Sequence, residues 1–297
     1  MCNMKKVIMV WIICLIGGMF PHIVHGEGAP HSLEHTMNKE IEEYLGKHTD
    51  RVVFRYENLQ TGEFVSKGGS IAKSAASTIK LPLALLIIEL VKSEEIELGK
   101  KLTYRSYHHY GGSGVIQYNE EGTTYTVEDL VHKMLVHSDN IAYIMLREHV
   151  GRQKFINYMK ELGADYAYPN GKNYTSANDL TLYLKHLYRI KGNSEFAGEV
   201  FKWLQNTAYD HGIPQGVKQP VAHKVGMIPM YNISNDTAIV LGESPYALTI
   251  LTTNYSYYES KKIISELTNL IDRVHREFKP PIIAKPLEVL KNRTLLL

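Results

Sequence analysis

Alternating apolar and polar residues mark the first strand pattern of the chain. The stretch "RVVFRYENL" (51–59) is rich in β-forming residues, and a second such stretch, "EFVSKGG", follows the turn "QTG". Alternation with a period of two is typical of a half-buried strand, so the two stretches predict a β-hairpin. An amphipathic helix is expected just before the hairpin, around Met37 to Leu45.

Helical periodicity dominates the middle of the chain. Residues 77–92 are largely apolar, and Thr126 with Asp129 and Ser176 with Asp179 have the spacing of N-terminal capping boxes. Further helices are expected over residues 141–149, 152–162 and 194–207.

Strand patterns return late in the chain, in "PVAHKVGMI", "DTAIVLG" and "YALTILTTN", and an amphipathic helix ends near Phe278. Strands at both ends with helices between them indicate a sheet assembled from distant segments, an α+β fold rather than alternating βαβ units. We therefore expect one domain with two lobes and a C-terminal extension that has no assigned role. Their bounds are 27–70 with 215–278 for the α/β lobe, 71–214 for an inserted all-α lobe, and 279–297 for the extension.

The first residues have the pattern of an export signal. Lys5 and Lys6 precede an apolar run from Val7 to Phe20, which is shorter than the roughly 20 residues of a membrane-spanning helix. We interpret residues 1–26 as a signal peptide that is cleaved, which predicts a secreted protein. An uncleaved N-terminal anchor, peripheral to the membrane at most, and lipid attachment at Cys14 are the alternatives.

Charge and composition exclude some classes of partner. Without Lys5 and Lys6, 31 basic residues stand against 31 acidic ones, so no global field favours nucleic acid. The stretch "HSLEH" (31–35) resembles an inverted zincin motif, but no third ligand can be identified. We expect no metal and no cofactor, and a protein that is a monomer.

Ser77 and Lys80 are the first candidate catalytic residues. Residues three apart in a helix share a face, so the two side chains can lie side by side at the start of the apolar segment "STIKLPLALLIIEL". A Lys among Leu and Ala residues is partly desolvated, which lowers its pKa and lets the neutral amine act as a base toward the hydroxyl. Alone, Ser77 could equally be an N-cap and Lys80 a solvated cation.

Two further motifs strengthen the catalytic interpretation. "VHSDNIA" places Ser138, Asp139 and Asn140 between two helical patterns, and "AHKVGMI" places Lys224 and Gly226 on a late strand. With these residues the sequence resembles the penicillin-recognising serine hydrolases, most closely the class A β-lactamases, whose signature is S-x-x-K, S-D-N and K-T-G in this order.

The resemblance implies a β-lactamase/transpeptidase-like fold, with an antiparallel sheet flanked by helices. It also implies roles for the catalytic residues. Ser77 would attack an amide carbonyl while Lys80 takes its proton. Ser138 would relay a proton to the leaving nitrogen, and Lys224 would hold Ser138 and the carboxylate of the substrate in a positive field.

Substrate-binding roles follow from the same resemblance. Asn140 would hydrogen-bond Lys80 and the amide side chain of the substrate, and Gly226 and Met227 would line the substrate site. The backbone N–H groups of Ser77 and Met227 would form the oxyanion hole, which in typical enzymes contributes roughly 3 kcal/mol per donor. Asp139 is expected to brace the loop rather than to react.

Two positions depart from the class A pattern. The segment "GADYAYPNGKNY" (163–174), where the family carries the Glu that activates the deacylating water, contains no Glu, and Asp165 is its only acid. Loss of such a base is worth about 10² to 10⁴ in rate. Val225 stands where the family has Thr or Ser, and Val has no hydroxyl to donate to a substrate carboxylate.

The sequence therefore predicts a class A β-lactamase-like serine hydrolase, acylated at Ser77 by a β-lactam or related amide, with doubtful turnover of β-lactams. A peptidoglycan DD-peptidase, or another cell-wall amide or ester hydrolase, is the first alternative, and a penicillin-binding sensor without turnover is the second. The expected partner is accordingly a small β-lactam or a peptidoglycan-derived peptide.

Overall fold

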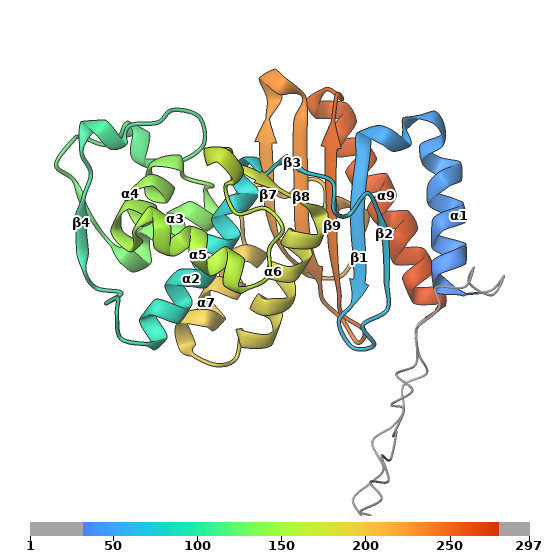
Figure 1. Ribbon diagram of the computed structural model, residues 1–297, viewed down its shortest axis with the longest axis horizontal. Helices are drawn as coiled ribbons and strands as arrows, with labels where there is room; N and C mark the ends of the chain where they lie inside the picture. The colour runs from blue at the N-terminus through green and yellow to red at the C-terminus, as the bar shows by residue number, and fades with distance from the viewer. Residues whose placement is uncertain (1–31, 279–297) are drawn as a thin grey trace, which may run out of the picture.

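A five-stranded antiparallel sheet is the main structural element of the protein (Figure 1). The computed structural model describes residues 32–278. The strand order is β2-β1-β9-β8-β7, so strands from both ends of the chain lie next to one another. The strands are β1 (Val52–Asn58), β2 (Phe64–Lys67), β7 (Val221–Ile228), β8 (Ile233–Val240) and β9 (Tyr246–Thr253). The expected α+β fold, with a sheet built from both chain ends, is confirmed.

Each face of the sheet is covered by a different set of helices. On one face α1 (Leu33–Leu45) and α9 (Tyr257–Glu277) pack side by side, and α8 (Ile213–Gly216) packs against α9. On the other face α6 (Ala177–Ile190) contacts β1 and β9 and joins the helical lobe to the sheet. Because side chains alternate along a strand, Phe54 belongs to the core under α1 and α9, whereas Val53 belongs to the core of the helical lobe.

The helical lobe is organised around α2 (Lys80–Lys92), nearly all of whose residues are buried. The other helices of this lobe are α3 (Val127–Val136), α4 (Asn140–Val150), α5 (Arg152–Glu161) and α7 (Glu195–Gln205). The lobe is not wholly helical, because two short ladders form in it. These are β3 (Lys73–Ser74) with β6 (Tyr174–Thr175), and β4 (Lys101–Thr103) with β5 (Thr124–Thr126).

Short 3₁₀ helices fill several of the connections. They are η1 (Gly46–Arg51), η2 (Ala76–Ile79), η3 (Ser106–His108), η4 (Ile116–Tyr118), η5 (Pro169–Gly171) and η6 (Pro229–Tyr231).

Capping side chains set several of the helix starts. Ser176 and Asp179 form the expected reciprocal capping box at α6, and Thr126 accepts from the backbone N–H of Asp129 at α3. Helix α1 begins earlier than the expected Met37, because the hydroxyl of Ser32 accepts from the backbone N–H of His35.

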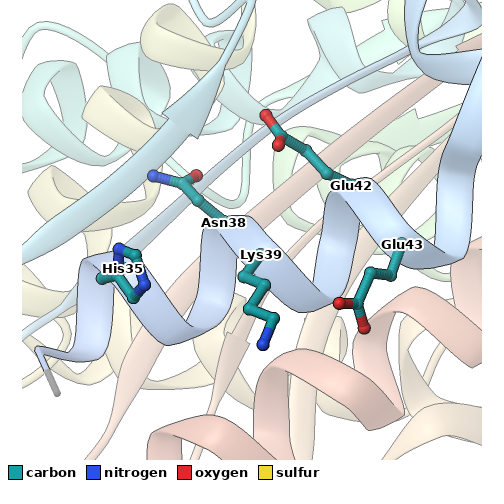
Figure 2. A pocket seen from close by; sticks show the side chains of 5 residues that line it. All are labelled: His35, Asn38, Lys39, Glu42 and Glu43. Atoms are coloured by element: carbon teal, nitrogen blue, oxygen red, sulfur yellow. The ribbon is translucent and has the colours of Figure 1, made fainter. Parts of the chain in front are cut away.

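A shallow hollow lies over the exposed side of α1 (Figure 2). It is lined by His35, Asn38, Lys39, Glu42 and Glu43, whose side chains spread along the helix instead of converging on one point. Of the "HSLEH" motif, His31 lies outside the described residues. Within residues 32–278 no group of three or more His, Cys, Asp or Glu side chains is arranged to hold a metal ion.

The described part of the chain contains no helix of the length and apolarity needed to cross a bilayer. The predicted signal peptide (1–26) and C-terminal extension (279–297) lie outside the described residues.

Candidate active site

Ser77 lies in a tight turn rather than at the first residue of an α-helix. The turn η2 is a 3₁₀ helix and α2 begins only at Lys80, so the expected α-helical start at Ser77 was wrong by one turn. Directly before Ser77, Ala76 has a left-handed φ of 47°, so a right-handed helix cannot extend back beyond Ser77. Strain of this kind in a non-glycine residue is common at functional sites.

The amine of Lys80 is the centre of the polar network. Its Nζ lies 3.1 Å from the Ser77 Oγ and 3.2 Å from the Ser138 Oγ. It donates to two groups that can only accept, the Ser138 carbonyl at 2.6 Å and the Asn140 Oδ1 at 2.7 Å. The orientation of the Asn140 amide is fixed because its Nδ2 donates to the carbonyl of Gly111. Two N–H groups are thus committed, and the third position of the nitrogen faces the hydroxyls.

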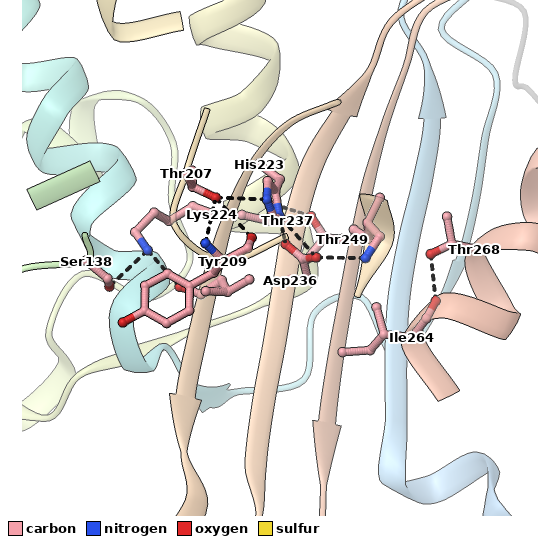
Figure 3. Close-up of polar contacts among 12 residues, drawn as sticks. Ser138, Thr207, Tyr209, His223, Lys224, Asp236, Thr237, Thr249, Ile264 and Thr268 are labelled. Carbon is pink, nitrogen blue, oxygen red and sulfur yellow. Dashed lines mark hydrogen bonds and ion pairs between the residues drawn. The ribbon is translucent and has the colours of Figure 1, made fainter. Parts of the chain in front are cut away.

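Ser138 connects Lys80 to Lys224. Its backbone is left-handed (φ 51°), and in this conformation both its carbonyl and its hydroxyl face Lys80. The Lys224 Nζ donates to the Ser138 Oγ at 3.0 Å and to the carbonyl of Val225 at 3.0 Å. The hydroxyl of Ser138 therefore lies between two amines. Figure 3 shows its contact with Lys224.

Burial lowers the pKa of both lysines. Desolvation holds the pKa of Lys80 well below its ordinary value, and the positive charge of Lys224 lowers it further, against the opposing charge of Asp139. Desolvation also lowers the pKa of Lys224 to about 7, against the charge of Asp236. The shift at Lys80 favours the neutral amine beside the Ser77 hydroxyl, which is the form that a general base requires.

Asp139 binds backbone N–H groups on two segments. Its Oδ1 accepts from Ile141 and Ala142 at the start of α4, and its Oδ2 accepts from Val115 and Ile116 at 2.6 and 2.8 Å. A Cβ at Gly114 would lie 2.4 Å from the Asp139 carboxylate, so only glycine allows this approach. The carboxylate joins the loop to the helix and is not directed at Ser77.

Strand β7 approaches the Ser77 turn at Gly226. A Cβ on Gly226 would lie 2.8 Å from the Ala75 carbonyl and 2.9 Å from the Ser77 nitrogen, so a side chain there would push the strand and the turn apart. On the next strand, the Asn235 Nδ2 donates to the Ser74 carbonyl at 2.8 Å. Met227 follows Gly226 on β7, opposite Ser234.

The segment 163–174 offers Ser77 no carboxylate. The backbone N–H of Asp165 donates to Asp179 at 2.7 Å, and the Asp165 side chain is exposed. The hydroxyls of Tyr143 and Tyr168 are hydrogen-bonded to each other. Near the end of the segment, the Asn173 Nδ2 donates to the Ala76 carbonyl. Among the residues that the structure describes, none of the hydrogen-bond partners of Lys80 is an acid.

One buried network was not predicted from the sequence. The His223 Nδ1 lies 3.0 Å from the Asp236 Oδ1, and the His223 Nε2 lies 3.1 Å from the Thr207 hydroxyl (Figure 3). Asp236 also accepts from the backbone N–H of Ile213. The network anchors the segment after α7 to β7 and β8, beside Lys224. Its one sequence signal is His223, which stands next to Lys224 in a strand whose other residues are not polar.

Five residues singled out in the sequence, Ser77, Lys80, Ser138, Asn140 and Lys224, form this one hydrogen-bonded cluster, and Gly226 packs against the same turn. The fold and the cluster together describe a serine hydrolase of the β-lactamase-like class. A family model described as "Beta-lactamase enzyme family" matches residues 36–274, and the chain belongs to this family.

Several solved structures share the fold. One titled "Structure of PBP-A" has a TM-score of 0.74 at 20% identity, covering 81% of this chain and 96% of that one. A β-lactamase from Sphaerobacter thermophilus DSM 20745 has a TM-score of 0.73 at 21% identity, covering 82% and 98%. An ancestral class A β-lactamase has a TM-score of 0.70 at 20% identity, covering 82% and 99%. A search of the curated proteins found no match.

Replacing Gly226 with Ala should separate β7 from the Ser77 turn. We expect Gly226→Ala to lower the free energy of unfolding by about 1–3 kcal/mol, the usual cost of overpacking, as measured by urea denaturation. The control is Gly99→Ala, where an added Cβ would meet nothing within 4 Å. Equal effects of the two substitutions would contradict the close approach of strand and turn.

The buried amine of Lys224 should make stability depend on pH. Its pKa is about 7 in the folded protein and about 10.4 in an unfolded chain, so between these values the unfolded state binds more protons. The free energy of unfolding should therefore rise with pH in this range. From pH 7 to pH 9 we expect the rise in the native protein to exceed that in Lys224→Met by about 2 kcal/mol, from urea denaturation at each pH. Parallel pH profiles would show that Lys224 is not desolvated.

Proposed function

We propose that this protein is a class A β-lactamase-like serine hydrolase that forms an acyl-enzyme at Ser77 with a β-lactam or a related amide, and that it releases the acyl group slowly. The supporting observation is the Lys80 amine, buried, 3.1 Å from the Ser77 Oγ and with two N–H groups already donated to acceptors. A lone pair on this nitrogen can take the proton of Ser77 as the hydroxyl attacks the carbonyl.

The proton then has a short path to the leaving nitrogen. Lys80 can pass it to the Ser138 hydroxyl at 3.2 Å, and Ser138 can donate its own proton to the amine that departs. The Lys224 Nζ lies 3.0 Å from the same oxygen. When Lys224 is protonated, its positive charge stabilises the negative charge that develops on the Ser138 oxygen as the proton leaves. The acyl group remains on the Ser77 oxygen, and the Asn140 amide and the backbone N–H groups of Ser77 and Met227 are its proposed ligands.

Slow release of the acyl group follows from the residues near the proposed ester at Ser77. Hydrolysis needs a base that takes a proton from water, and the segment 163–174 presents only the exposed Asp165. One structural relative is a Leu-to-Glu mutant of PBP-A, solved as an acyl-enzyme complex with penicillin G, at 20% identity and a TM-score of 0.74. We extend acylation by penicillin to this chain as part of the proposal, with the protein acting outside the cytoplasm as a monomer.

Intact-protein mass spectrometry with benzylpenicillin tests both halves of the proposal. We expect the mass of one penicillin to be added within minutes and lost about 10² to 10⁴ times more slowly than it is gained, because no carboxylate base takes a proton from the water. Ser77→Ala should not be labelled, whereas Ser93→Ala, at the far end of α2, should react like the native protein.

Two results would contradict the proposal. Absence of labelling in the native protein would exclude acylation, and rapid multiple turnover that requires Ser77 would exclude slow release.

Val225 gives a second test, directed at substrate affinity. It is buried on β7 between Lys224 and Gly226 and has no hydroxyl. We expect Val225→Thr to increase the second-order rate constant of acylation by benzylpenicillin about tenfold, because a hydrogen bond to a charged group contributes about 1.5–3 kcal/mol. The methyl ester of the same penicillin, which has no carboxylate, is the control. An equal gain for acid and ester, or no gain, would argue against a carboxylate site at this position.

A further inference from the structure

His223 and Asp236 form a buried pair beside Lys224, and the proposed reaction gives this pair no role (Figure 3). His223 directly precedes Lys224 on β7, and Asp236 on β8 stands opposite Val225, the residue after Lys224. His223 is 3% exposed and Asp236 is 1% exposed. Because side chains alternate along a strand, the pair lies on the face of the sheet opposite to the one from which Lys224 reaches Ser138.

The hydrogen bonds of the His223 ring determine where its protons lie. The Thr207 hydroxyl donates its single proton to the carbonyl of Tyr209 at 3.0 Å, so toward the His223 Nε2, at 3.1 Å, it can only accept. The Nε2 therefore carries a proton. The Nδ1 lies 3.0 Å from the Asp236 Oδ1, and an ionised carboxylate only accepts, so this contact needs a second proton on the ring.

The other oxygen of Asp236 is also used as an acceptor. Its Oδ2 accepts from the backbone N–H of Ile213 at 2.9 Å. A Cβ on Gly212 would lie 2.7 Å from the same oxygen, so the chain is held tightly against the carboxylate. An imidazolium that donates to such a carboxylate forms a pair that is neutral as a unit, which lowers the cost of burying either charge.

The charge of this pair matters because of Lys224. Desolvation lowers the pKa of Lys224 to about 7, and the negative charge of Asp236 opposes this effect. Both hydrogen-bond partners of the Lys224 Nζ in the described chain, the Ser138 hydroxyl and the Val225 carbonyl, are uncharged. An Asp236 carboxylate without a cationic partner would therefore hold the Lys224 amine in its protonated form.

One other histidine faces the pair. His211, on the segment after α7, is buried, and desolvation lowers its pKa against the charge of Asp236. Lys261 of α9 lowers the pKa of His211 further, and Asp210 raises it. The neutral form of His211 is thus favoured, and a neutral ring cannot neutralise the carboxylate.

The remaining titratable groups around β7 are either committed or at the surface. In the helical lobe, the pKa of Lys80 is held well below its ordinary value, and the Asp139 carboxylate accepts four backbone N–H groups. Lys202 of α7 pairs with Glu199 of the same helix. The charged residues of α7, which packs on β7, are all at least partly exposed: Glu195, Glu199 and Lys202.

We propose that His223 is a positioning residue that acts on the reaction through Lys224. Its second proton neutralises Asp236, so that the Lys224 amine has no buried counter-ion and acylation declines once this amine is deprotonated. The kinetic part of this inference rests on the proposed function, in which the Lys224 cation stabilises negative charge on the Ser138 oxygen. His223 itself touches neither Ser77 nor Lys80.

The pH profile of acylation tests the proposal. The second-order rate constant for labelling of Ser77 by benzylpenicillin is measured by mass spectrometry from about pH 6 to pH 10. His223→Asn keeps a donor for Asp236 but removes the cation, so we expect the alkaline limb of the profile to move upward by about one pH unit. In the double variant His223→Asn/Asp236→Asn the carboxylate is also gone, and the limb should return to its native position.

A purely structural role predicts a different result. Two substitutions in one buried network would then lower the rate more than either alone, without returning the alkaline limb to its native pH. The control is His275→Asn, which also removes a buried ring that is hydrogen-bonded through both nitrogens. The His275 ring packs on Tyr246, opposite Val240, four residues or about 13 Å along β8 from Asp236. This variant should keep the native profile.

Two measurements do not depend on acylation. In the native protein at neutral pH, the nitrogen NMR spectrum of the His223 ring should show a proton on both nitrogens. By urea denaturation from pH 7 to pH 9, the rise in unfolding free energy that depends on Lys224, taken as the difference from matched Lys224→Met variants, should shrink by about a third in His223→Asn.

The outcomes separate this inference from the proposed function. A single ring proton on His223, an unmoved alkaline limb in His223→Asn, no return in the double variant, or an equal shift in His275→Asn would each overturn the role of His223 and leave acylation at Ser77 intact. Absence of labelling in the native protein would overturn the proposed function. The ring protons and the Lys224-dependent stability would then decide the inference, and an unchanged stability difference in His223→Asn would overturn it.

Discussion

The transfer of the Lys80 amine out of water is the physical constraint on which the site depends. Burying a cation is costly, so the group is stable there only if it loses its proton or finds strong acceptors. Desolvation and a second amine nearby favour a neutral nitrogen over an ammonium ion at Lys80, and two obligate acceptors hold its N–H groups. A lysine on the surface, with the same neighbours in sequence, would remain charged and could not act as a base.

Each lobe supplies a part that the other lacks. The helical lobe contributes Lys80, Ser138 and Asn140, and the sheet contributes Lys224 on its edge strand. The ion pair of the buried Glu57 on β1 with Lys185 of α6 ties the lobes together. Arg55, which pairs with Glu57 on the same strand, also donates to Asn178 at the start of α6. The distance between the two lysines is therefore set by packing across the whole molecule and not by any one loop.

Local patterns in the sequence predicted the strands of the sheet and most of the helices. The three motifs were found by their residues and by their order along the chain. They identified Ser77, Lys80, Ser138, Asn140 and Lys224, because each motif is short and has a recognisable chemistry. The left-handed residue before Ser77 was missed, since Ala has no sequence preference for that conformation. The pairing of His223 with Asp236 was also missed, because the two come together only through the register of β7 with β8.

The order of the strands in the sheet has a consequence for synthesis of the chain. Strand β1 emerges early from the ribosome, yet its neighbour β9 is made only after the entire helical lobe. Until β9 is made, β1 can pair only with β2, and an isolated two-stranded hairpin is marginally stable in water. A polypeptide that ends before Tyr246 lacks the strand that joins the two halves of the sheet. Premature termination therefore leaves Lys224 without the complete sheet that holds it beside Ser138, and the cluster assembles only when nearly the whole chain has been made.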